Sequence, residues 1–331
     1  MRPFRYSWFG GLLAVALGAH LVGSTIASAQ NESEQPTGGF DLTQERDREL
    51  FRRYADRADM KFENIDPFFK ADRVSHVANG VALRNRARGY IHSRGVPLKS
   101  QVVRSFLLWN LSDGDKVGAD TVPVLLDGNV VQGRKTADNT DPCWSRAGNH
   151  SYIADVTPYT DQTGGPNQDY EVTLPFNGDT STSGQNPWSS FESTRVLLEG
   201  ASLVVIFRNE NTVGPLYLFA PPGDNMFISS ATYLLPSPGL GNGLFTMIGA
   251  DGQRGSGHSN FASNELTFFD GGQIAGPPVA ASDWDGSDGL TLPQLWDTHT
   301  HEVRIGNSVS QIDYMQAADC LVPVGFVLDQ E

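Results

Sequence analysis

The sequence predicts an all-β protein with two tandem antiparallel β-sandwich or jelly-roll domains, preceded by one short N-terminal helix. Three observations predict this class. The 331 residues include 35 glycines and 19 prolines but only five methionines, which favours turns and strands over helices. After about residue 78, short β-rich runs alternate with clusters of Gly, Pro, Asn and Asp. Several of these runs recur in the same order in the second half of the chain.

Residues 1–29 have the features of a secretory signal peptide. Arg2 and Arg5 give a positive start, a short apolar stretch follows, and Ala27-Ser28-Ala29 offers a small-residue cleavage pattern. The stretch is too short and too broken by Gly to predict a membrane span. We therefore expect a mature chain that is secreted, periplasmic or at the cell surface, without membrane insertion once the signal is removed.

The mature chain is strongly acidic. Loss of Arg2 and Arg5 with the signal leaves 22 basic residues against 38 acidic ones. Nonspecific binding to nucleic acid or to an anionic membrane needs a basic face, so this balance disfavours both partners.

Residues 30–77 are expected to form a flexible lead followed by one amphipathic helix. Residues 30–40 are polar and contain Gly and Pro. Apolar side chains then recur at helical spacing, at Leu50, Phe51, Tyr54, Ala58 and Phe62. Glu49 and Arg53 form a favourable i,i+4 pair. The helix is expected to pack on the body of the protein.

The β-rich body divides into two predicted domains, residues 78–213 and 214–331. Five features match in order, namely Asp113-Gly114 with Asp251-Gly252, LLDG 125–128 with FFDG 268–271, Trp144 with Trp284, EVTL 171–174 with EVRI 302–305, and SLVVIF 202–207 with LVPVGFVL 321–328. A single Asp-Gly hairpin is common turn chemistry. Five matches in one order favour a divergent tandem duplication.

Cys143 and Cys320 are the two cysteines of the chain. An exported protein favours a disulfide between them, the alternative being two buried free thiols. The bond would join the two predicted domains. It would close a long loop, which the chain-entropy model values at about 4–5 kcal/mol.

Several segments resemble an uncharacterised family of secreted β-rich domains in bacteria and archaea. They are SFLLWN, VPVLLDGNVV, SYIADVTPYT, EGASLVVIF, GADGQ, SDWD and ADCL, from about residue 80 to the C-terminus. Members of that family often precede adhesion-like or cell-wall repeats on extracellular proteins. The resemblance implies an extracellular β-sandwich and supplies no catalytic residues. The chain ends directly after the domain, so the resemblance does not predict surface attachment.

The densest acidic segment is SDWDGSDG, residues 282–289. Asp283, Asp285 and Ser287 alternate as calcium ligands do, but Asp288 replaces the glycine of an EF-hand loop and Gln294 replaces its final Glu. We expect either a looser Ca²⁺ site at Asp283, Asp285 and Asp288, or an Asx-rich turn with a structural role.

His299 and His301 stand two residues apart, with Asp297 on the same strand face. Two imidazoles on one face can reach one metal ion. The alternative is two polar surface residues, which an isolated His-x-His pair more often represents.

Residues 70–104 carry eight basic residues and one acidic residue. Arg84, Arg86 and Arg88 would line one strand face and suit a sulfated or carboxylated polymer. The alternative, which the overall acidity favours, is that these arginines pair with acidic loops of the protein itself.

Two hypotheses for function follow. The first is a non-catalytic module that binds an extracellular glycan, a cell-wall polymer or a protein partner, with Trp188 and Trp284 stacking on sugar rings. The sequence contains no nucleophile elbow, H-E-x-x-H, P-loop or dinucleotide fingerprint. The alternative is a jelly-roll hydrolase of glycoconjugates, which requires two carboxylates about 5–10 Å apart across a cleft.

Overall fold

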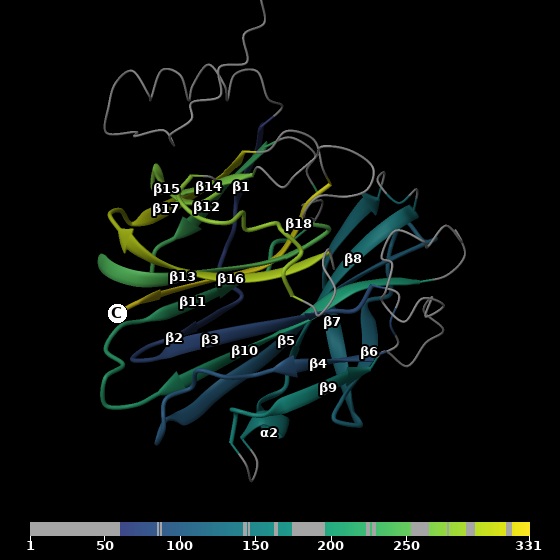
Figure 1. Ribbon diagram of the computed structural model, residues 1–331, viewed down its shortest axis with the longest axis horizontal. Coiled ribbons are helices and arrows are strands. Elements are labelled where there is room, and N and C mark those ends of the chain that lie inside the picture. Colours follow the sequence, from purple (N-terminus) through teal and green to yellow (C-terminus); the bar gives the residue numbers. More distant parts are fainter. Residues whose placement is uncertain are drawn as a thin grey trace, which may run out of the picture. The chain divides into compact units, whose positions relative to one another are not determined.

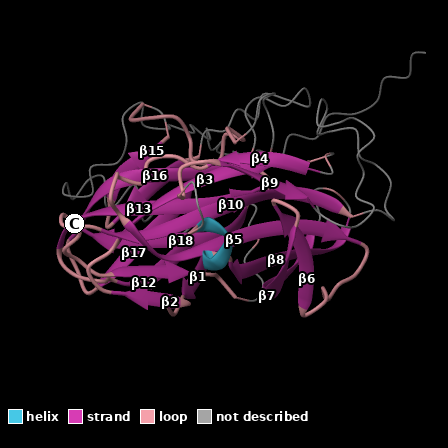
Figure 2. Cartoon of the chain, turned by 90° about the horizontal axis from the view of Figure 1, so that it is seen from below, coloured by secondary structure: helices cyan, strands magenta, loops and turns pink. Residues whose placement is uncertain are grey.

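The regular secondary structure of the described residues is almost entirely β-strand, and the strands pack in sheets, as the sequence predicts (Figure 2). The computed structural model describes residues 60–84, 86, 88–141, 144, 146–161, 165–173, 196–222, 226, 230–252, 265–276, 278–288, 295–315 and 320–331. Within these ranges the helix is the single turn α2, Thr157–Thr160. No helix of these residues is long and apolar enough to cross a membrane.

Eight consecutive strands form one antiparallel sheet in the order β3-β10-β5-β8-β7-β6-β9-β4 (Figure 1). They are β3 (Ser75–Ala82), β4 (Arg88–His92), β5 (Gln101–Asp113), β6 (Thr121–Leu126), β7 (Asn129–Asp141), β8 (Arg146–Asp155), β9 (Asp169–Thr173) and β10 (Leu197–Arg208). The sheet curls so that its two end strands approach each other. A side chain on Gly89 of β4 would meet Val81 of β3, so glycine permits this close approach.

Ten strands form two further sheets, β1-β12-β17-β14-β15 and β16-β13-β18-β11-β2. They are β1 (Met60–Asn64), β2 (Phe69–Ala71), β11 (Leu216–Phe219), β12 (Ser230–Pro236), β13 (Gly241–Ala250), β14 (Leu266–Phe269), β15 (Gly272–Ala275), β16 (Trp296–Ile305), β17 (Val309–Met315) and β18 (Val322–Gln330). β1 pairs with β12 in parallel, and β2 pairs with β11 in antiparallel orientation.

The two halves use the same strand order. Adding eight to each strand number of the first sheet gives β11-β18-β13-β16 and β15-β14-β17-β12, which are the orders of the other two sheets without β1 and β2. The β7–β8 pairing of the first half has no counterpart among the described pairings of β15 and β16.

The matching Asp-Gly turns also make matching contacts. Asp127 and Asp270 both have φ of 48°, each followed by a glycine with positive φ. The backbone N–H of Asp127 donates to the carbonyl of Glu171, and the N–H of Glu171 donates back to the Asp127 carboxylate. Asp270 exchanges the same two bonds with Gln311. The structural counterpart of EVTL 171–174 is therefore the β17 segment around Gln311, not EVRI 302–305.

Three large apolar cores lie among the described strands. Trp109, Tyr152 and Leu203 belong to the core enclosed by the eight-stranded sheet, and Trp109 stacks on Tyr152 with ring centroids 5.8 Å apart. A second core lies between the two five-stranded sheets and includes Phe245 and Phe326.

The third core joins the outer faces of β5 and β10 to those of β13 and β18. Leu203 and Val205 of β10 enter the first core, whereas Val204 and Ile206 enter the third. β10 and β18 are thus covered on both faces, which explains why SLVVIF and LVPVGFVL are continuous apolar runs rather than alternating ones.

The segment before residue 78 contains strands. Residues 41–59, which hold most of the predicted helix, and the predicted flexible lead at 30–40 lie outside the described residues. The last residues assigned to that helix, Met60–Phe62, instead begin β1. β1 and β2 complete the sheets of the second half, so this half contains strands from both ends of the body.

A buried histidine links the two halves. A ring nitrogen of His76 on β3, Nδ1, lies 2.9 Å from Oδ2 of Asp329 on β18. Its Nε2 lies 2.7 Å from Oγ1 of Thr246 on β13. The side chains of His76 and Asp329 are fully buried, so each satisfies a polar group that water cannot reach.

We expect His76→Ala to lower the free energy of unfolding by about 3 kcal/mol, because the buried Asp329 carboxylate loses its imidazole partner and keeps, among the described residues, only Ser75 Oγ and the N–H of Leu244 as donors. Equilibrium urea unfolding measures the change. His92→Ala is the matched control, since His92 also faces an aspartate but is exposed. An equal loss in both variants would contradict the role assigned to His76.

The predicted Cys143–Cys320 bond remains a prediction, because Cys143 lies outside the described residues. Two contacts favour it. Trp144 Nε1 donates to Asp251 Oδ1 at 2.6 Å, and the preceding residue Ala250 pairs with Val322 near the start of β18. We expect native protein to resist thiol alkylation until it is reduced, which intact mass spectrometry reports. Two alkylated thiols in unreduced native protein would rule the bond out.

Candidate functional site

A pocket of 410 Å³ opens where the seam between β3 and β4 meets the second half. Its lining comprises Ala78, Asn79, Gly80, Val81, Arg86, Arg88, Gly89, Tyr90, His92, Ser287, Asp288 and Thr298. The pocket exists because the eight-stranded sheet ends at β3 and β4, and because the loop before β16 folds against that seam. Its volume lies in the range of about 300–1,000 Å³ that is typical of ligand pockets.

Strand β4 presents three polar side chains to this pocket. Arg88, Tyr90 and His92 alternate with buried residues, as the strand period requires. Tyr90 OH donates to Glu171 Oε2 at 2.6 Å, and Arg88 Nη1 lies 3.7 Å from the same oxygen. Tyr90 and His92 are not among the site residues predicted from the sequence, although the alternation in RGYIH places both on the same strand face as Arg88.

The three arginines of the predicted basic patch do not share one face. β3 ends at Ala82, so Arg84 lies in the turn before β4 and is fully buried. Its Nη2 lies 3.2 Å from Glu199 Oε1 and 3.7 Å from Asp251 Oδ1. Arg86 and Arg88 line the pocket. Arg84 and Arg88 pair with acidic residues of the protein itself, which is the alternative that the overall acidity favours.

Burial dominates the electrostatics around Arg84. It raises the pKa of Glu199 well above its ordinary value, more than the Arg84 charge lowers it. It also raises the pKa of Asp251 to about 7, with the nearby Asp141 charge adding to the effect. The guanidinium of Arg84 lies over the ring of Trp144, 4.1 Å from its centroid.

Trp284 offers no exposed ring to a sugar. It is fully buried in the core between the five-stranded sheets, where it meets Tyr314 edge to face at 5.4 Å. Gly249 makes room for it, since a side chain there would collide with the indole. Although its neighbours in the sequence are polar, Trp284 points into the core and anchors the loop there. Trp188 lies outside the described residues.

The acidic loop at residues 282–288 is held against the strands of both halves. The N–H of Ser287 donates to Asp297 Oδ1 at 3.0 Å, and that of Asp288 donates to the carbonyl of Trp296 at 3.1 Å. The N–H of Ala82 on β3 donates to the carbonyl of Asp288 at 2.7 Å. These bonds bury Asp283 and Asp285 and place Asp288 on the pocket wall.

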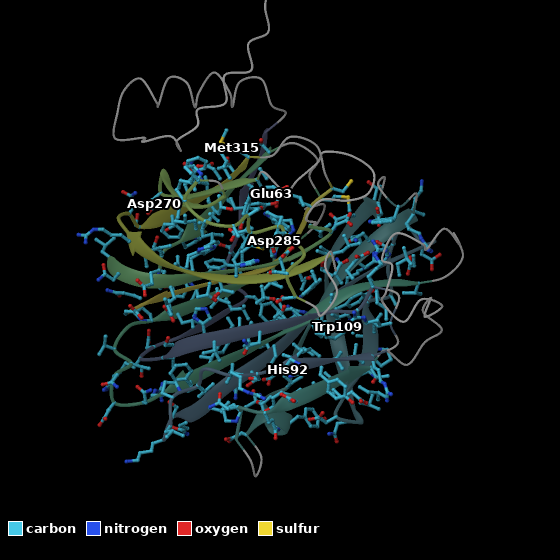
Figure 3. All side chains as sticks on the ribbon, viewed as in Figure 1. Glu63, His92, Trp109, Asp270, Asp285 and Met315 are labelled. Carbon is cyan, nitrogen blue, oxygen red and sulfur yellow. The ribbon has the colours of Figure 1, made fainter. Side chains whose placement is uncertain are left out.

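The loop meets the two histidines of β16, but the imidazoles do not converge on one point. His301 Nε2 lies 2.6 Å from Asp283 Oδ1. His299 Nε2 lies 3.4 Å from Asp297 Oδ1 and 3.8 Å from Asp285 Oδ1. Ligand atoms of Asp285, Asp297 and His299 all lie within 4.8 Å of one another. The Asp285 side chain is labelled in Figure 3. Asp283 and Asp288, of the predicted calcium trio, are not in this group.

The cluster concentrates negative charge behind the pocket wall. Burial raises the pKa of Asp288 to about 7, and the charges of Asp297 and Asp285 add to this. Burial also raises the pKa of Asp297. Burial opposes the charged form of His299, but its hydrogen bond to Asp297 and the surrounding carboxylates outweigh this and raise its pKa to about 9.

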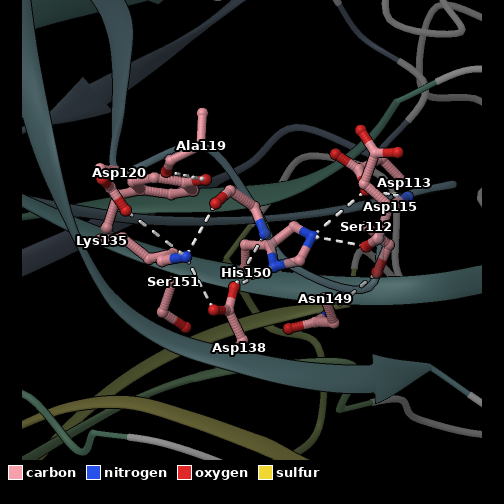
Figure 4. A network of polar contacts seen from close by, with 12 residues as sticks. Ser112, Asp113, Asp115, Ala119, Asp120, Lys135, Asp138, Asn149, His150 and Ser151 are labelled. Carbon is pink, nitrogen blue, oxygen red and sulfur yellow. Dashed lines mark hydrogen bonds and ion pairs between the residues drawn. The ribbon is translucent and has the colours of Figure 1, made fainter.

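A second polar network surrounds His150 within the first half (Figure 4). His150 is fully buried; its Nδ1 lies 2.7 Å from Asp138 Oδ1 and its Nε2 lies 3.2 Å from Asp113 Oδ1. Lys135 Nζ donates to Asp138 Oδ2 at 2.7 Å. Burial lowers the pKa of His150, but the bonds and charges of Asp113 and Asp138 outweigh it, and the net pKa is raised.

The raised pKa of His150 predicts a pH dependence of stability. The folded state favours the imidazolium, so its contribution is complete below the unfolded pKa of about 6.5 and is lost as pH rises through the folded value. As pH rises from about 6.5 through the folded pKa of His150, we expect the urea midpoint to fall less in His150→Gln than in the unmodified chain. His92→Gln should retain the full decline, and an unchanged profile in His150→Gln would contradict the assignment.

Comparisons of the chain with protein family models, with curated proteins and with solved structures found no match. The pocket at the β3–β4 seam and the acidic cluster behind it are therefore the features of the molecule from which a function is inferred.

Proposed function

We propose that the mature chain is a secreted, non-catalytic module that binds an extracellular glycan or cell-wall polymer in the pocket at the β3–β4 seam. The observation that carries this proposal is the pocket's lining. It combines an exposed aromatic ring, two guanidinium groups, an imidazole, an amide, hydroxyls and a carboxyl group around a volume of 410 Å³.

The chemistry of these groups suits a polyhydroxylated ligand. Tyr90 is about half exposed, so its ring can lie against an apolar sugar face. Asn79, Thr298 and Asp288 supply donors and acceptors for hydroxyl groups. Arg86 and Arg88 favour a ligand that carries a carboxylate or sulfate, because a guanidinium matches those groups in a bidentate geometry.

We also propose that the body is a tandem duplication of one jelly-roll domain. The shared strand order and the matching contacts of Asp127 and Asp270 support it. In each half the first, eighth, third and sixth strands are neighbours, as are the fifth, fourth, seventh and second, an arrangement of two Greek keys. On this basis the pocket is a feature of the first domain's seam, closed by the loop before β16 of the second.

A hydrolase of glycoconjugates is the second candidate, and one observation favours it. Asp288 lines the pocket with its pKa raised to about 7, so it is poised to act as a general acid near neutral pH. The Asp285 and Asp297 carboxylates lie behind the same wall, but neither lines the pocket. The binding function is preferred because a second carboxylate facing the pocket is missing from its described lining.

We expect the mature protein to bind acidic glycans or cell-wall polymers on an array, with Tyr90→Ala and Arg88→Ala each weakening binding about tenfold or more, as central contacts do. Arg104→Ala is the matched control. Arg104 is an exposed arginine paired with Asp155, and it does not line the pocket.

Three results would change the proposal. Absence of signal on every glycan and polymer would reject it, and binding that survives Tyr90→Ala and Arg88→Ala would place it elsewhere on the molecule. Release of sugar from a bound glycan, abolished by Asp288→Asn, would replace the binding module with the hydrolase.

A further inference from the structure

We infer that Asp285, Asp297 and His299 form a binding site for a first-row divalent cation, Zn²⁺ or Mn²⁺. The inference does not depend on what the pocket binds. It rests on the spacing of the three side chains, on the burial of their neighbours, and on the kinds of donor atom that converge there.

The spacing is that of atoms which share a metal ion. Zinc bonds of about 2.0–2.2 Å at tetrahedral angles separate a nitrogen and an oxygen ligand by about 3.4 Å. His299 Nε2 lies 3.4 Å from Asp297 Oδ1 and 3.8 Å from Asp285 Oδ1. The hydrogen bond between His299 Nε2 and Asp297 Oδ1 is long, and Ser287 Oγ lies 3.1 Å from the same nitrogen, so a bound ion would replace both of these partners.

Buried carboxylate oxygens beside this group lack a compensating donor. Asp297 is fully buried, yet its Oδ2 has no hydrogen-bond partner among the residues that the structure describes. The same holds for Oδ2 of the buried Asp283, whose other oxygen faces His301. A buried carboxylate oxygen without a donor is costly, and a cation is the kind of ligand that removes that cost.

The surrounding charge also calls for a cation. Asp283, Asp285, Asp288 and Asp297 all act electrostatically on His299 or on one another. Two imidazoles face these four carboxylates. A divalent ion between Asp285, Asp297 and His299 would add positive charge beside these carboxyl groups.

The donor set selects the metal. Ca²⁺ takes six to eight oxygen ligands, whereas imidazole nitrogen together with carboxylate oxygen suits Zn²⁺ and Mn²⁺. The expected calcium trio therefore contributes only Asp285. Ser287 strengthens the site, because its N–H donates to Asp297 Oδ1 and so orients that carboxylate.

Isothermal titration of the chelator-treated mature chain with Zn²⁺, Mn²⁺ and Ca²⁺ tests the inference, with metal content measured after gel filtration. We expect one Zn²⁺ or Mn²⁺ per chain, and weaker binding of Ca²⁺. His299→Ala and Asp297→Asn should weaken binding by at least about 100-fold, because removal of an outer partner alone costs about 10–100-fold.

Asp155→Asn is the matched control for Asp297→Asn, since Asp155 is half exposed, faces Arg104 Nε at 3.6 Å and lies outside the pocket lining. It should bind metal as the unmodified chain does. Lack of stoichiometric binding by the unmodified chain, tighter Ca²⁺ than Zn²⁺ or Mn²⁺ binding, or loss of the ion in Asp155→Asn would each overturn the inference. Circular dichroism of each variant separates loss of the site from loss of the fold, and Asp285→Asn replaces any variant that does not fold.

Discussion

The fold depends on two strands, β10 and β18, that are apolar on both faces. Successive residues of β10 enter different cores, so neither face of the strand tolerates water. Burial of both faces contributes roughly 25 cal/mol for each Å² of apolar surface removed from water. A polar side chain buried in the contact between the halves therefore needs a hydrogen-bond partner within the protein. His76 and Asp329 lie within the contact between the halves, and they are compatible with it because they bond to each other.

The same dry environment gives the acidic residues their character. The carboxyl groups of Glu199, Asp251, Asp283 and Asp297 are enclosed in this environment. Around Glu199 and Asp251 the fold supplies its own cation, Arg84. Around Asp297 the basic groups among the described residues are the imidazoles of His299 and His301. The cluster of Glu199 and Asp251 contains the guanidinium of Arg84, whereas the described residues of the Asp297 cluster include no guanidinium. We therefore propose the metal ion for the Asp297 cluster.

The sequence predicted features that depend on local chemistry. The strand period, the continuous runs of β10 and β18, and the turns at Asp127 and Asp270 all follow from residues within a few positions of one another. The sequence could not place Arg84 and Trp284, because their direction depends on distant strands. Both stand among polar neighbours, yet Arg84 is enclosed by Glu199 and Asp251, and Trp284 by Tyr314 and Gly249. The convergence of Asp285 with His299 likewise depends on how the loop folds onto β16, which its own residues do not specify.

The pairing of β1 and β2 bears on the order in which the body can assemble. Both strands precede the first half in the chain, yet their partners are β12 and β11 of the second half. Until those partners exist, the edges of β1 and β2 remain open, and exposed edges are the usual route to association between chains. Domains generally fold from the N-terminus during synthesis, so the eight strands of the first sheet can pair while the second half is still unmade. Of the described strands, the two that are synthesised first are therefore among the last to pair with their neighbours.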